Sequence, residues 1–296
     1  RTEAAVGFPQ VILIDNSSAC NLRCSMCDHR NIQKHRKIQV MDMKLYSKII
    51  DEIALKQPDT RVWQIYFGDP FTCKNIAERI AQAKHKGLTD VVLNSNGALM
   101  TPDRAGDVIK AGLDTMYVGI DAAREATYRK IRVGGDFGST VQNVLSYRDL
   151  LLAHGRPGQQ LFVQFVVTDT NEDQVEEFTS FWLNEGVQVK IRPKISWAGL
   201  VTAENLRDNQ GMARKPCYWS MQTMSICADG RVSLCAVDIH CRVENGDINE
   251  VSIETAWNQA LKLYRTMHAE HRFDELPQMC RDCRDWQSAY ADYVQK

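Results

Sequence analysis

The sequence predicts an α/β protein, arranged as a partial (β/α)6 barrel with a small C-terminal domain. Short apolar runs alternate with amphipathic segments of helical period, a pattern typical of βα repeats around a parallel sheet. There are six such apolar runs, too few for a closed eight-stranded barrel. A change in composition near residues 200–215, where Asn, Asp, Gly and Arg gather, ends the alternation. We therefore place the barrel in residues 1–205 and a second domain in residues 206–296.

Each expected strand is a short apolar run that leads into polar or turn-forming residues. The expected strands are 11–14, 62–67, 91–93, 116–120, 161–167 and 187–191. Amphipathic stretches follow five of them, and the expected helices are 43–54, 76–85, 102–111, 140–153 and 172–184. A helical tail is expected at 286–294. In folds of this kind the functional site lies at the carboxyl ends of the strands.

Composition excludes several classes of protein. The 36 basic and 37 acidic residues give a net charge of -1, so no overall field attracts nucleic acid or an anionic membrane. No apolar run approaches the length of a membrane span, and residues 1–10 lack the layout of a signal peptide. The ten cysteines therefore indicate metal ligation in a reducing, cytoplasmic compartment and not disulfides.

Cys20, Cys24 and Cys27 form a C-x3-C-x2-C group directly after the first expected strand. Three thiolates on one loop suit a [4Fe-4S] cluster that needs four ligands, which leaves one iron open to another molecule. A zinc site or three reduced core thiols is the alternative, although zinc knuckles prefer paired C-x2-C units. The group favours a cluster with an open iron.

This cysteine group resembles that of the radical S-adenosylmethionine (SAM) superfamily, apart from Met26 where an aromatic residue is usual. The resemblance implies that SAM chelates the open iron and is cleaved to a 5′-deoxyadenosyl radical. Further motifs at strand ends resemble the SAM-binding elements of that superfamily. In the first of them, Gly68-Asp69-Pro70, an Asp replaces the usual Glu. The SAM-binding residues so implied are Gly68, Asp69 and Pro70, then Asn94, Ser95 and Asn96, then Asp121, and Arg132 for the SAM carboxylate or ribose.

Four cysteines of the second region form two further units. Cys217 leads to Cys235 through an Asp229-Gly230 turn, and Cys280 and Cys283 form a C-x2-C pair. Four such thiols suit a closed cluster, with a tetrahedral zinc ribbon as the rival. Behind a radical SAM motif, the region resembles the twitch domain, the short relative of the SPASM domain, which carries one auxiliary [4Fe-4S] cluster. The expected cofactors are thus two [4Fe-4S] clusters and SAM.

Three cysteines remain after these assignments. Cys73 and Cys227 lie in stretches that indicate core thiols. Cys241 differs, because many relatives have a glycine at this turn beyond Cys235. Twitch enzymes resemble the aminoglycoside-pathway epimerases and dehydrogenases, in which the radical removes hydrogen from a carbinol carbon. Cys241 favours epimerisation by return of a hydrogen atom, with oxidation to a ketone, the auxiliary cluster being the electron acceptor, as the alternative.

The remaining site predictions concern the substrate. Arg192 and Lys194, at the end of the sixth expected strand, are candidates to bind a hydroxylated substrate or act as base, and Asp238 to contact a substrate ammonium. The expected substrate is an aminoglycoside, aminocyclitol or sugar, and the expected reductant is a protein such as flavodoxin or ferredoxin. A peptide-modifying SPASM-type enzyme is a second alternative, although such enzymes commonly carry a leader-binding domain, for which the few residues before Val11 leave no room.

Overall fold

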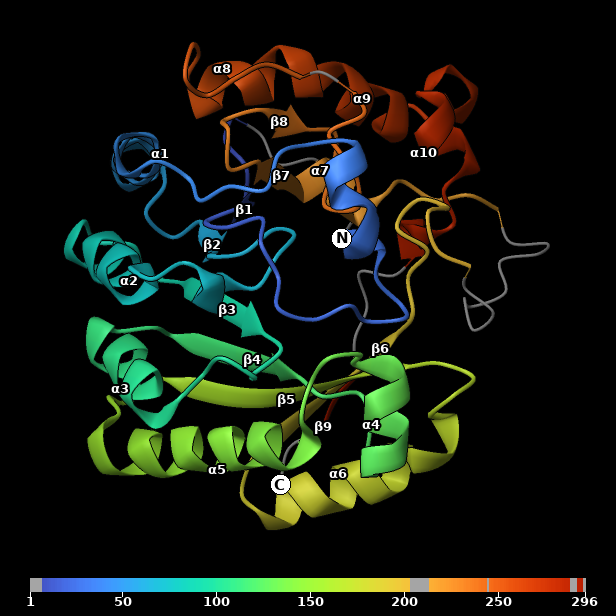
Figure 1. Cartoon of the computed structure of the whole chain (residues 1–296). Helices are drawn as coiled ribbons and strands as arrows, with labels where there is room; N and C mark the ends of the chain where they lie inside the picture. The colour runs from blue at the N-terminus through green and yellow to red at the C-terminus, as the bar shows by residue number, and fades with distance from the viewer. Residues whose placement is uncertain (1–6, 203–212, 244, 288–291, 295–296) are drawn as a thin grey trace.

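The computed structural model describes residues 7–202, 213–243, 245–287 and 292–294. Its strands are β1 (Val11–Ile14), β2 (Arg61–Trp63), β3 (Val91–Ser95), β4 (Thr115–Gly119), β5 (Gln160–Val167), β6 (Gln188–Pro193), β7 (Thr223–Ile226), β8 (Val232–Ser233) and β9 (Asp292–Val294). They form one sheet in the order β8-β7-β1-β2-β3-β4-β5-β6-β9 (Figure 1). β1 to β6 pair in parallel, which confirms the predicted βα repeat.

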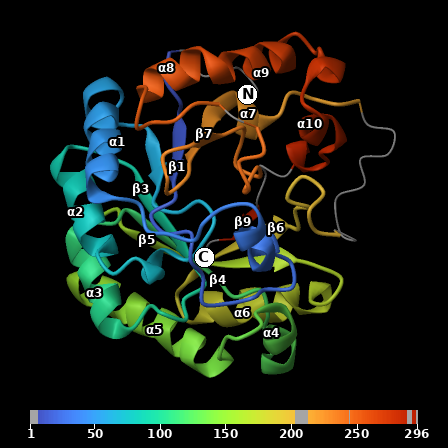
Figure 2. The same cartoon turned by 45° about the horizontal axis from the view of Figure 1, so that its top comes forward.

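Helices cover the outer face of this curved sheet (Figure 2). The α-helices are α1 (Met43–Lys56), α2 (Ile76–His85), α3 (Pro102–Ala111), α4 (Glu125–Ile131), α5 (Phe137–His154), α6 (Val175–Asn184), α7 (Tyr218–Gln222), α8 (Ile253–Asn258), α9 (Ala260–Ala269) and α10 (Gln278–Asp282). Short 3-10 helices are η1 (Asp28–Lys34), η2 (Pro70–Thr72), η3 (Glu172–Gln174), η4 (Phe273–Glu275) and η5 (Asp285–Gln287). The five predicted helices are present, three of them longer or differently bounded at an end.

α3 illustrates how local sequence sets these elements. Pro102 lies in the first turn, where a helix has no use for its N–H. Ala105, Val108 and Ile109 form the buried stripe that packs on the sheet. Gly112 ends the helix at φ 93°, a left-handed conformation that glycine adopts without a Cβ clash.

The sheet sorts side chains onto two faces, because successive residues of a strand point in opposite directions. In β6, Val189 and Ile191 pack into the main hydrophobic core beneath the helices. Lys190 and Arg192, which alternate with them, face the inside of the partial barrel. The apolar outer face therefore stabilises the fold, while the inner face is free to carry polar residues.

The C-terminal region extends the sheet at both edges. β7 pairs in parallel with β1, and β8 returns antiparallel to β7 through the predicted turn, where Gly230 has φ 99°. At the other edge β9 pairs antiparallel with β6. No strand in the described part of the chain joins the two edges, so the barrel is partial and open, as predicted.

Three expectations about the elements need comment. The expected helical tail at 286–294 is wrong at 292–294, where β9 is a strand that pairs with β6, and residues 288–291 of it lie outside the described residues. β2 ends at Trp63, four residues before the expected end at residue 67. The predicted domain boundary after residue 205 falls in 203–212, outside the described residues, and stays a prediction.

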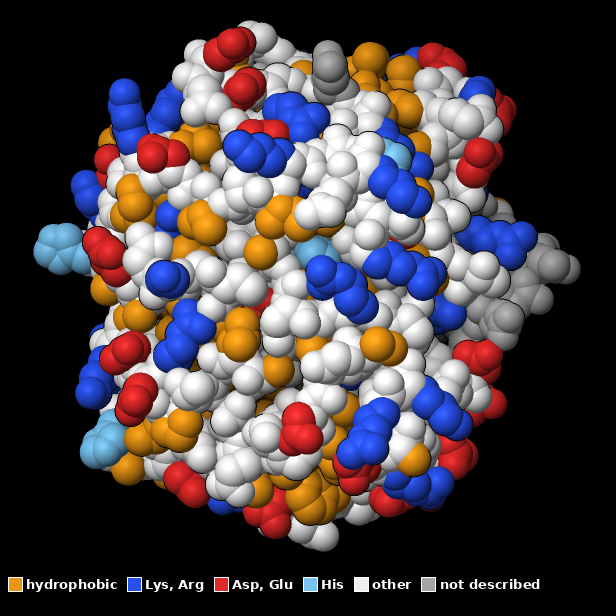
Figure 3. All heavy atoms as spheres, in the orientation of Figure 1, with side chains coloured by type: hydrophobic (Ala, Val, Ile, Leu, Met, Phe, Trp, Pro, Cys, Tyr) orange, Lys and Arg blue, Asp and Glu red, His pale blue; other side chains and the backbone are white. Residues whose placement is uncertain are grey.

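The surface bears both signs of charge. Basic and acidic side chains are interspersed over the face shown in Figure 3, in keeping with the net charge of -1. None of the helices in the described ranges combines the length and the apolar composition needed to cross a bilayer.

Candidate active site

The first three cysteines lie on the loop between β1 and η1, and all three line one cavity of about 450 Å³. The loop lies close against Gly68, where an added Cβ would come within 2.2 Å of the Ser17 carbonyl oxygen. The Asp69 N–H donates to the Ala19 carbonyl at 2.7 Å and ties the same loop to the end of β2. The backbone therefore holds the cysteine loop over the carboxyl ends of the strands.

Asp69 organises the opposite wall of this cavity. Its buried carboxylate accepts hydrogen bonds from Ser95 Oγ at 2.9 Å, from the Asn96 N–H at 2.8 Å and from the Phe71 N–H at 3.0 Å. Burial raises the pKa of Asp69, and these three donors oppose that shift. Two predicted motifs, after β2 and after β3, are thus joined through one carboxylate.

Asn96 connects that wall to the cysteine loop, because its Nδ2 lies 3.8 Å from Cys20 Sγ and donates to Asn21 Oδ1 at 2.9 Å. Of the predicted SAM-binding residues, those that line the cavity are Gly68, Asp69, Asn94, Ser95, Asn96 and Arg132. Pro70 instead begins the buried turn η2. The strand-end motifs and the cysteines therefore share one cavity.

Arg132 and Asp121, each predicted to contact SAM, form a buried ion pair with one another. Asp121 is fully buried with φ 62°, and it also accepts the Val166 N–H at 2.7 Å. Arg132 Nη1 lies 3.6 Å from Cys24 Sγ. Burial alone would lower the pKa of Arg132, but the Asp121 carboxylate and Cys24 outweigh it and raise the pKa. Asp121 lies behind the cavity wall, where it holds Arg132 against a cysteine.

These residues fit a three-cysteine iron-sulfur site. Burial raises the pKa of Cys20 to about 11 and that of Cys27 to about 12, so without a bound cation both thiols stay protonated at neutral pH. Asn96 and Arg132 place N–H groups on two of the sulfurs, as suits thiolate ligands. Iron would supply the positive charge that keeps these cysteines ionised.

The four later cysteines surround a second, smaller cavity, which Cys217, Cys235, Cys280 and Cys283 line together. Burial raises the pKa of Cys280 to about 12 and also raises the pKa values of the other three. Arg214 donates to the carbonyl of Cys280 at 2.6 Å. In the described part of the chain, no three His, Cys, Asp or Glu side chains converge closely enough for a single metal ion. The four thiols enclose a space, as a cluster requires.

Residues 17–181, more than half of the chain, match the radical SAM superfamily. The chain belongs to this superfamily. Residues 217–284 match the iron-sulfur cluster-binding domain named SPASM, which favours iron-sulfur over the rival zinc ribbon. The predicted family is therefore confirmed, and with it the cofactors: a [4Fe-4S] cluster and SAM in the radical SAM domain, and auxiliary iron-sulfur binding in the SPASM domain.

Two curated relatives illustrate the range of this superfamily. The chain is 27% identical over 187 residues to the tungsten-containing aldehyde ferredoxin oxidoreductase cofactor-modifying protein of Pyrococcus furiosus, over 61% of this chain and 50% of the relative. It is 30% identical over 183 residues to the GTP 3′,8-cyclase of Heliobacterium modesticaldum, over 58% of this chain and 51% of the relative. The chain thus spans about half the length of these relatives.

Solved structures share the fold over most of the chain. BtrN in complex with AdoMet and 2-DOIA is 17% identical with a TM-score of 0.65, over 93% of this chain and 92% of BtrN. Streptococcus suis SuiB bound to the precursor peptide SuiA is 12% identical with a TM-score of 0.72, over 88% of this chain and 67% of SuiB. At these identities the likeness concerns the fold alone.

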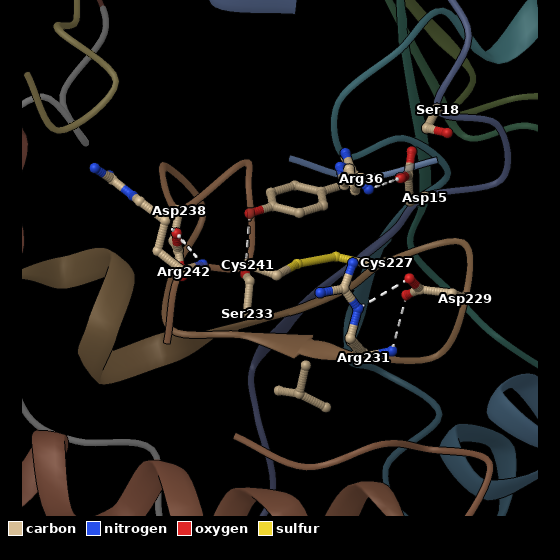
Figure 4. Close-up of a disulfide and its surroundings, with 12 residues drawn as sticks. Asp15, Ser18, Arg36, Cys227, Asp229, Arg231, Ser233, Asp238, Cys241 and Arg242 are labelled. Atoms are coloured by element: carbon tan, nitrogen blue, oxygen red, sulfur yellow. Dashed lines mark hydrogen bonds and ion pairs between the residues drawn. A yellow bond between two sulfur atoms is a disulfide. The ribbon is translucent and has the colours of Figure 1, made fainter. Parts of the chain in front are cut away.

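Cys241 does not line the radical SAM cavity. Its sulfur is bonded to that of Cys227, 14 residues away in sequence (Figure 4). The expectation of no disulfide is therefore wrong, as is that of a free core thiol at Cys227. The hairpin of β7 and β8 brings the two residues together, and Cys241 has φ 49°, which explains why a glycine suits this turn. Cys73, in contrast, is buried in the main core as predicted.

Asp238 is also absent from the cavity wall. Its fully buried carboxylate accepts the Leu234 N–H at 3.3 Å and the Arg242 N–H at 3.0 Å, so it fixes the loop of the hairpin (Figure 4). This placement gives no support to a contact between Asp238 and a substrate ammonium, which stays a prediction. Local sequence could not show this, because the acceptor role depends on how the loop folds back on itself.

The predicted basic residues Arg192 and Lys194 do line the cavity. Sequence reasoning missed Lys190, which lines it too, two residues before Arg192 on β6. The period-two alternation of Gln188, Lys190 and Arg192 with apolar residues was the signal that could have found it. One segment of the chain thus contributes three cations to the wall of this cavity: Lys190, Arg192 and Lys194.

Proposed function

We propose that this radical SAM enzyme removes hydrogen from a carbinol carbon of a sugar, aminocyclitol or aminoglycoside and oxidises it to a ketone. When bound, SAM and its cluster supply a 5′-deoxyadenosyl radical, and the auxiliary cluster supplies a one-electron acceptor. The observation that carries the proposal is that Trp219 and Val237 line both cavities. A substrate in the larger cavity is therefore separated from the second group of cysteines by a single layer of side chains.

The chain's own residues must hold the carbinol and accept its hydroxyl proton. Arg192 and Lys194 lie on the cavity wall and supply donors for substrate hydroxyl groups. A guanidinium keeps its charge and cannot take a proton, so we assign the binding role to Arg192. Lys194 is then the proposed base.

Oxidation is favoured over inversion by the placement of Cys241. Inversion needs an S–H group on the face of the substrate opposite the radical, yet Cys241 is bonded to Cys227 and lies outside the cavity lining. Oxidation needs no thiol. BtrN, whose structure was solved with AdoMet and 2-DOIA, shares the fold over 93% of this chain, which supports a small-molecule substrate.

Epimerisation through Cys241 is the second candidate, and one observation supports it. Cys241 packs in the same apolar cluster as Tyr66 and Phe67, both of which line the cavity. After reduction of the disulfide, the Cys241 thiol would lie one side chain behind the wall. A peptide substrate, as in the SuiB complex with SuiA, is a third candidate that rests on shared fold.

The reductant is proposed to be a small electron-transfer protein such as flavodoxin or ferredoxin, and the enzyme is proposed to act in the cytoplasm. A partner of this kind docks on the surface and passes electrons to the first cluster.

The test is an anaerobic incubation of the reconstituted enzyme with SAM, reductant and candidate sugars or aminocyclitols in deuterated water. Oxidation predicts a product two mass units lighter with no deuterium on carbon, and the same product from Cys241→Ala. Epimerisation predicts a product one mass unit heavier, with one deuterium on carbon, that is lost in Cys241→Ala. Cys73→Ala, which removes a thiol remote from the cavity, is the matched control. Absence of 5′-deoxyadenosine with every substrate would overturn both readings.

A further inference from the structure

The buried arginines in the described part of the chain have a carboxylate or a hydrogen-bond acceptor beside them: Arg79 donates to the Met41 carbonyl at 2.6 Å and Arg265 to the Trp257 carbonyl at 2.8 Å. Arg36 pairs with Asp15 at 2.6 Å with side-chain exposures of 2% and 0% (Figure 4). Arg132 pairs with the fully buried Asp121. This is the expected arrangement, because a charge taken out of water is costly unless an opposite charge or hydrogen bonds replace the water.

Lys190 and Arg192 break this pattern. Neither side chain makes a hydrogen bond or ion pair with any residue in the described ranges, although Lys190 is only 6% exposed. Three aromatic rings enclose the Lys190 ammonium, at 4.2, 5.1 and 5.6 Å from the centroids of Tyr117, Tyr293 and Trp63. Ring faces stabilise a cation but accept no conventional hydrogen bond, so the N–H donors of both side chains point toward the cavity.

The pKa values of Lys190 and Arg192 are both lowered, as expected for buried cations without an anionic partner. Burial, with a smaller contribution from the neighbouring cations Arg192 and Arg61, lowers the pKa of Lys190 to about 7. Burial likewise lowers the pKa of Arg192. Tyr293, Asp121 and Tyr117 oppose the shift at Arg192, and Asp121 is already paired with Arg132.

In the described lining of the cavity, no carboxylate pairs with Lys190 or Arg192. Among the described residues that line it, Asp69 alone has a carboxylate, and three donors already occupy that group. SAM would not supply the missing partner, because its one carboxylate is expected on the open iron. A polycationic aminoglycoside would add more positive charge to the same space.

We infer that Lys190 and Arg192 bind an anionic group, a phosphoryl or a carboxylate, on the substrate of this enzyme. The guanidinium fork supplies paired donors and the ammonium a point charge, the usual combination for either anion. The inference rests on the proposed function for the location of the substrate and narrows its class. Phosphorylated sugars or sugar acids fit the cavity, and free aminoglycosides do not.

The test is protection of Lys190 from reductive methylation in the anaerobically reconstituted, SAM-bound enzyme. Formaldehyde forms an imine with the amine, dimethylamine–borane reduces the imine to the methylamine, and mass spectrometry measures the product. The probes are inorganic phosphate, glucuronate, glucose and 2-deoxystreptamine. Phosphate or glucuronate should slow methylation of Lys190, and the stronger of the two identifies the anion. Glucose and the cationic 2-deoxystreptamine should not, and the exposed Lys56 should react equally in all samples.

Arg192→Met provides the decisive comparison. Losing one charged hydrogen-bonding partner should raise the concentration of anion needed for half-protection by about ten- to hundredfold. Lys56→Met, on the outer helix α1, should leave it unchanged. Equal protection by all four probes, or by none, overturns the inference, as does an unaltered half-protection concentration in Arg192→Met. Release of 5′-deoxyadenosine from SAM, assayed separately, shows whether radical chemistry persists when anion binding fails.

Discussion

The buried pair of Arg132 and Asp121 offers the sharpest test of how this site is held together. Arg132→Met removes the guanidinium and leaves the Asp121 carboxylate, which is fully buried, with only the Val166 N–H as a strong donor. Asp121→Asn keeps a carbonyl oxygen for Val166 and leaves Arg132 unpaired. The two single variants therefore strand opposite charges in the same place.

The magnitude follows from burial. Side-chain exposures of 12% for Arg132 and 0% for Asp121 place this pair among buried ion pairs. Removing one partner of such a pair costs about 3–5 kcal/mol. For a domain somewhat larger than 200 residues this corresponds to a fall in apparent Tm of roughly 6–15 °C. An exposed pair such as Arg124 with Asp173 should cost under about 1 kcal/mol.

The assay is a double-mutant cycle on reconstituted enzyme, with unfolding followed by scanning fluorimetry and iron counted in each sample. Arg132 also contacts Cys24 Sγ, but that contact is lost in both variants lacking the arginine and cancels in the cycle. The double variant, with no stranded charge, should be more stable than the sum of the single losses predicts. Single variants no less stable than Arg124→Met, or an additive cycle, would refute the reasoning.

Three further predictions concern the clusters and the cavity. Gly68→Ala should abolish SAM-dependent activity, since its Cβ would lie 2.2 Å from the Ser17 carbonyl oxygen; SAM binding and iron content measure the effect. Cys280→Ser should lose roughly half of the iron while the first cluster still cleaves SAM, which iron assay and 5′-deoxyadenosine release check. Lys190, with its pKa lowered by burial to about 7, should be mostly neutral by pH 8, when exposed lysines are still protonated. Reductive methylation should therefore modify Lys190 first, at a rate that rises through pH 7 and then levels off. A rate at Lys190 that keeps rising to pH 10, as the rate at Lys56 should, would contradict this prediction.

The parts of the site that sequence could predict depend on short spacing. Cys20, Cys24 and Cys27 lie on one loop, and their spacing alone places three thiols together. Strand-end residues such as Asp69 and Asn96 were also predictable, because the carboxyl ends of parallel strands meet at one edge of a sheet. The cavity does bring these residues together.

The parts that sequence could not predict depend on register and on chain reversal. Sequence motifs predict that Arg132 and Asp121 each contact SAM. Nothing local shows that the φ of 62° at Asp121 and the hydrogen bond from the Val166 N–H in β5 orient the Asp121 carboxylate toward Arg132. The bond between Cys227 and Cys241 depends on how the turn after Asp238 folds. Propensity and motif carry no information on such contacts.

The SPASM-matching region is attached to the barrel by strand pairing and by side-chain hydrogen bonds. β7 belongs to the SPASM-matching region, yet it pairs in parallel with β1, the strand that leads into the first cysteine loop. Tyr66, on the cavity wall beyond β2, donates to Ser233 Oγ at 2.9 Å and to the Cys235 carbonyl at 3.2 Å. The hairpin of β7 and β8, which leads to Cys235, is therefore fixed to the barrel by its pairing with β1 and by the Tyr66 side chain. The hairpin could not shift against the barrel without breaking buried hydrogen bonds. A rigid attachment of this kind keeps the second group of cysteines at a constant separation from the cavity, as the proposed one-electron transfer from substrate requires.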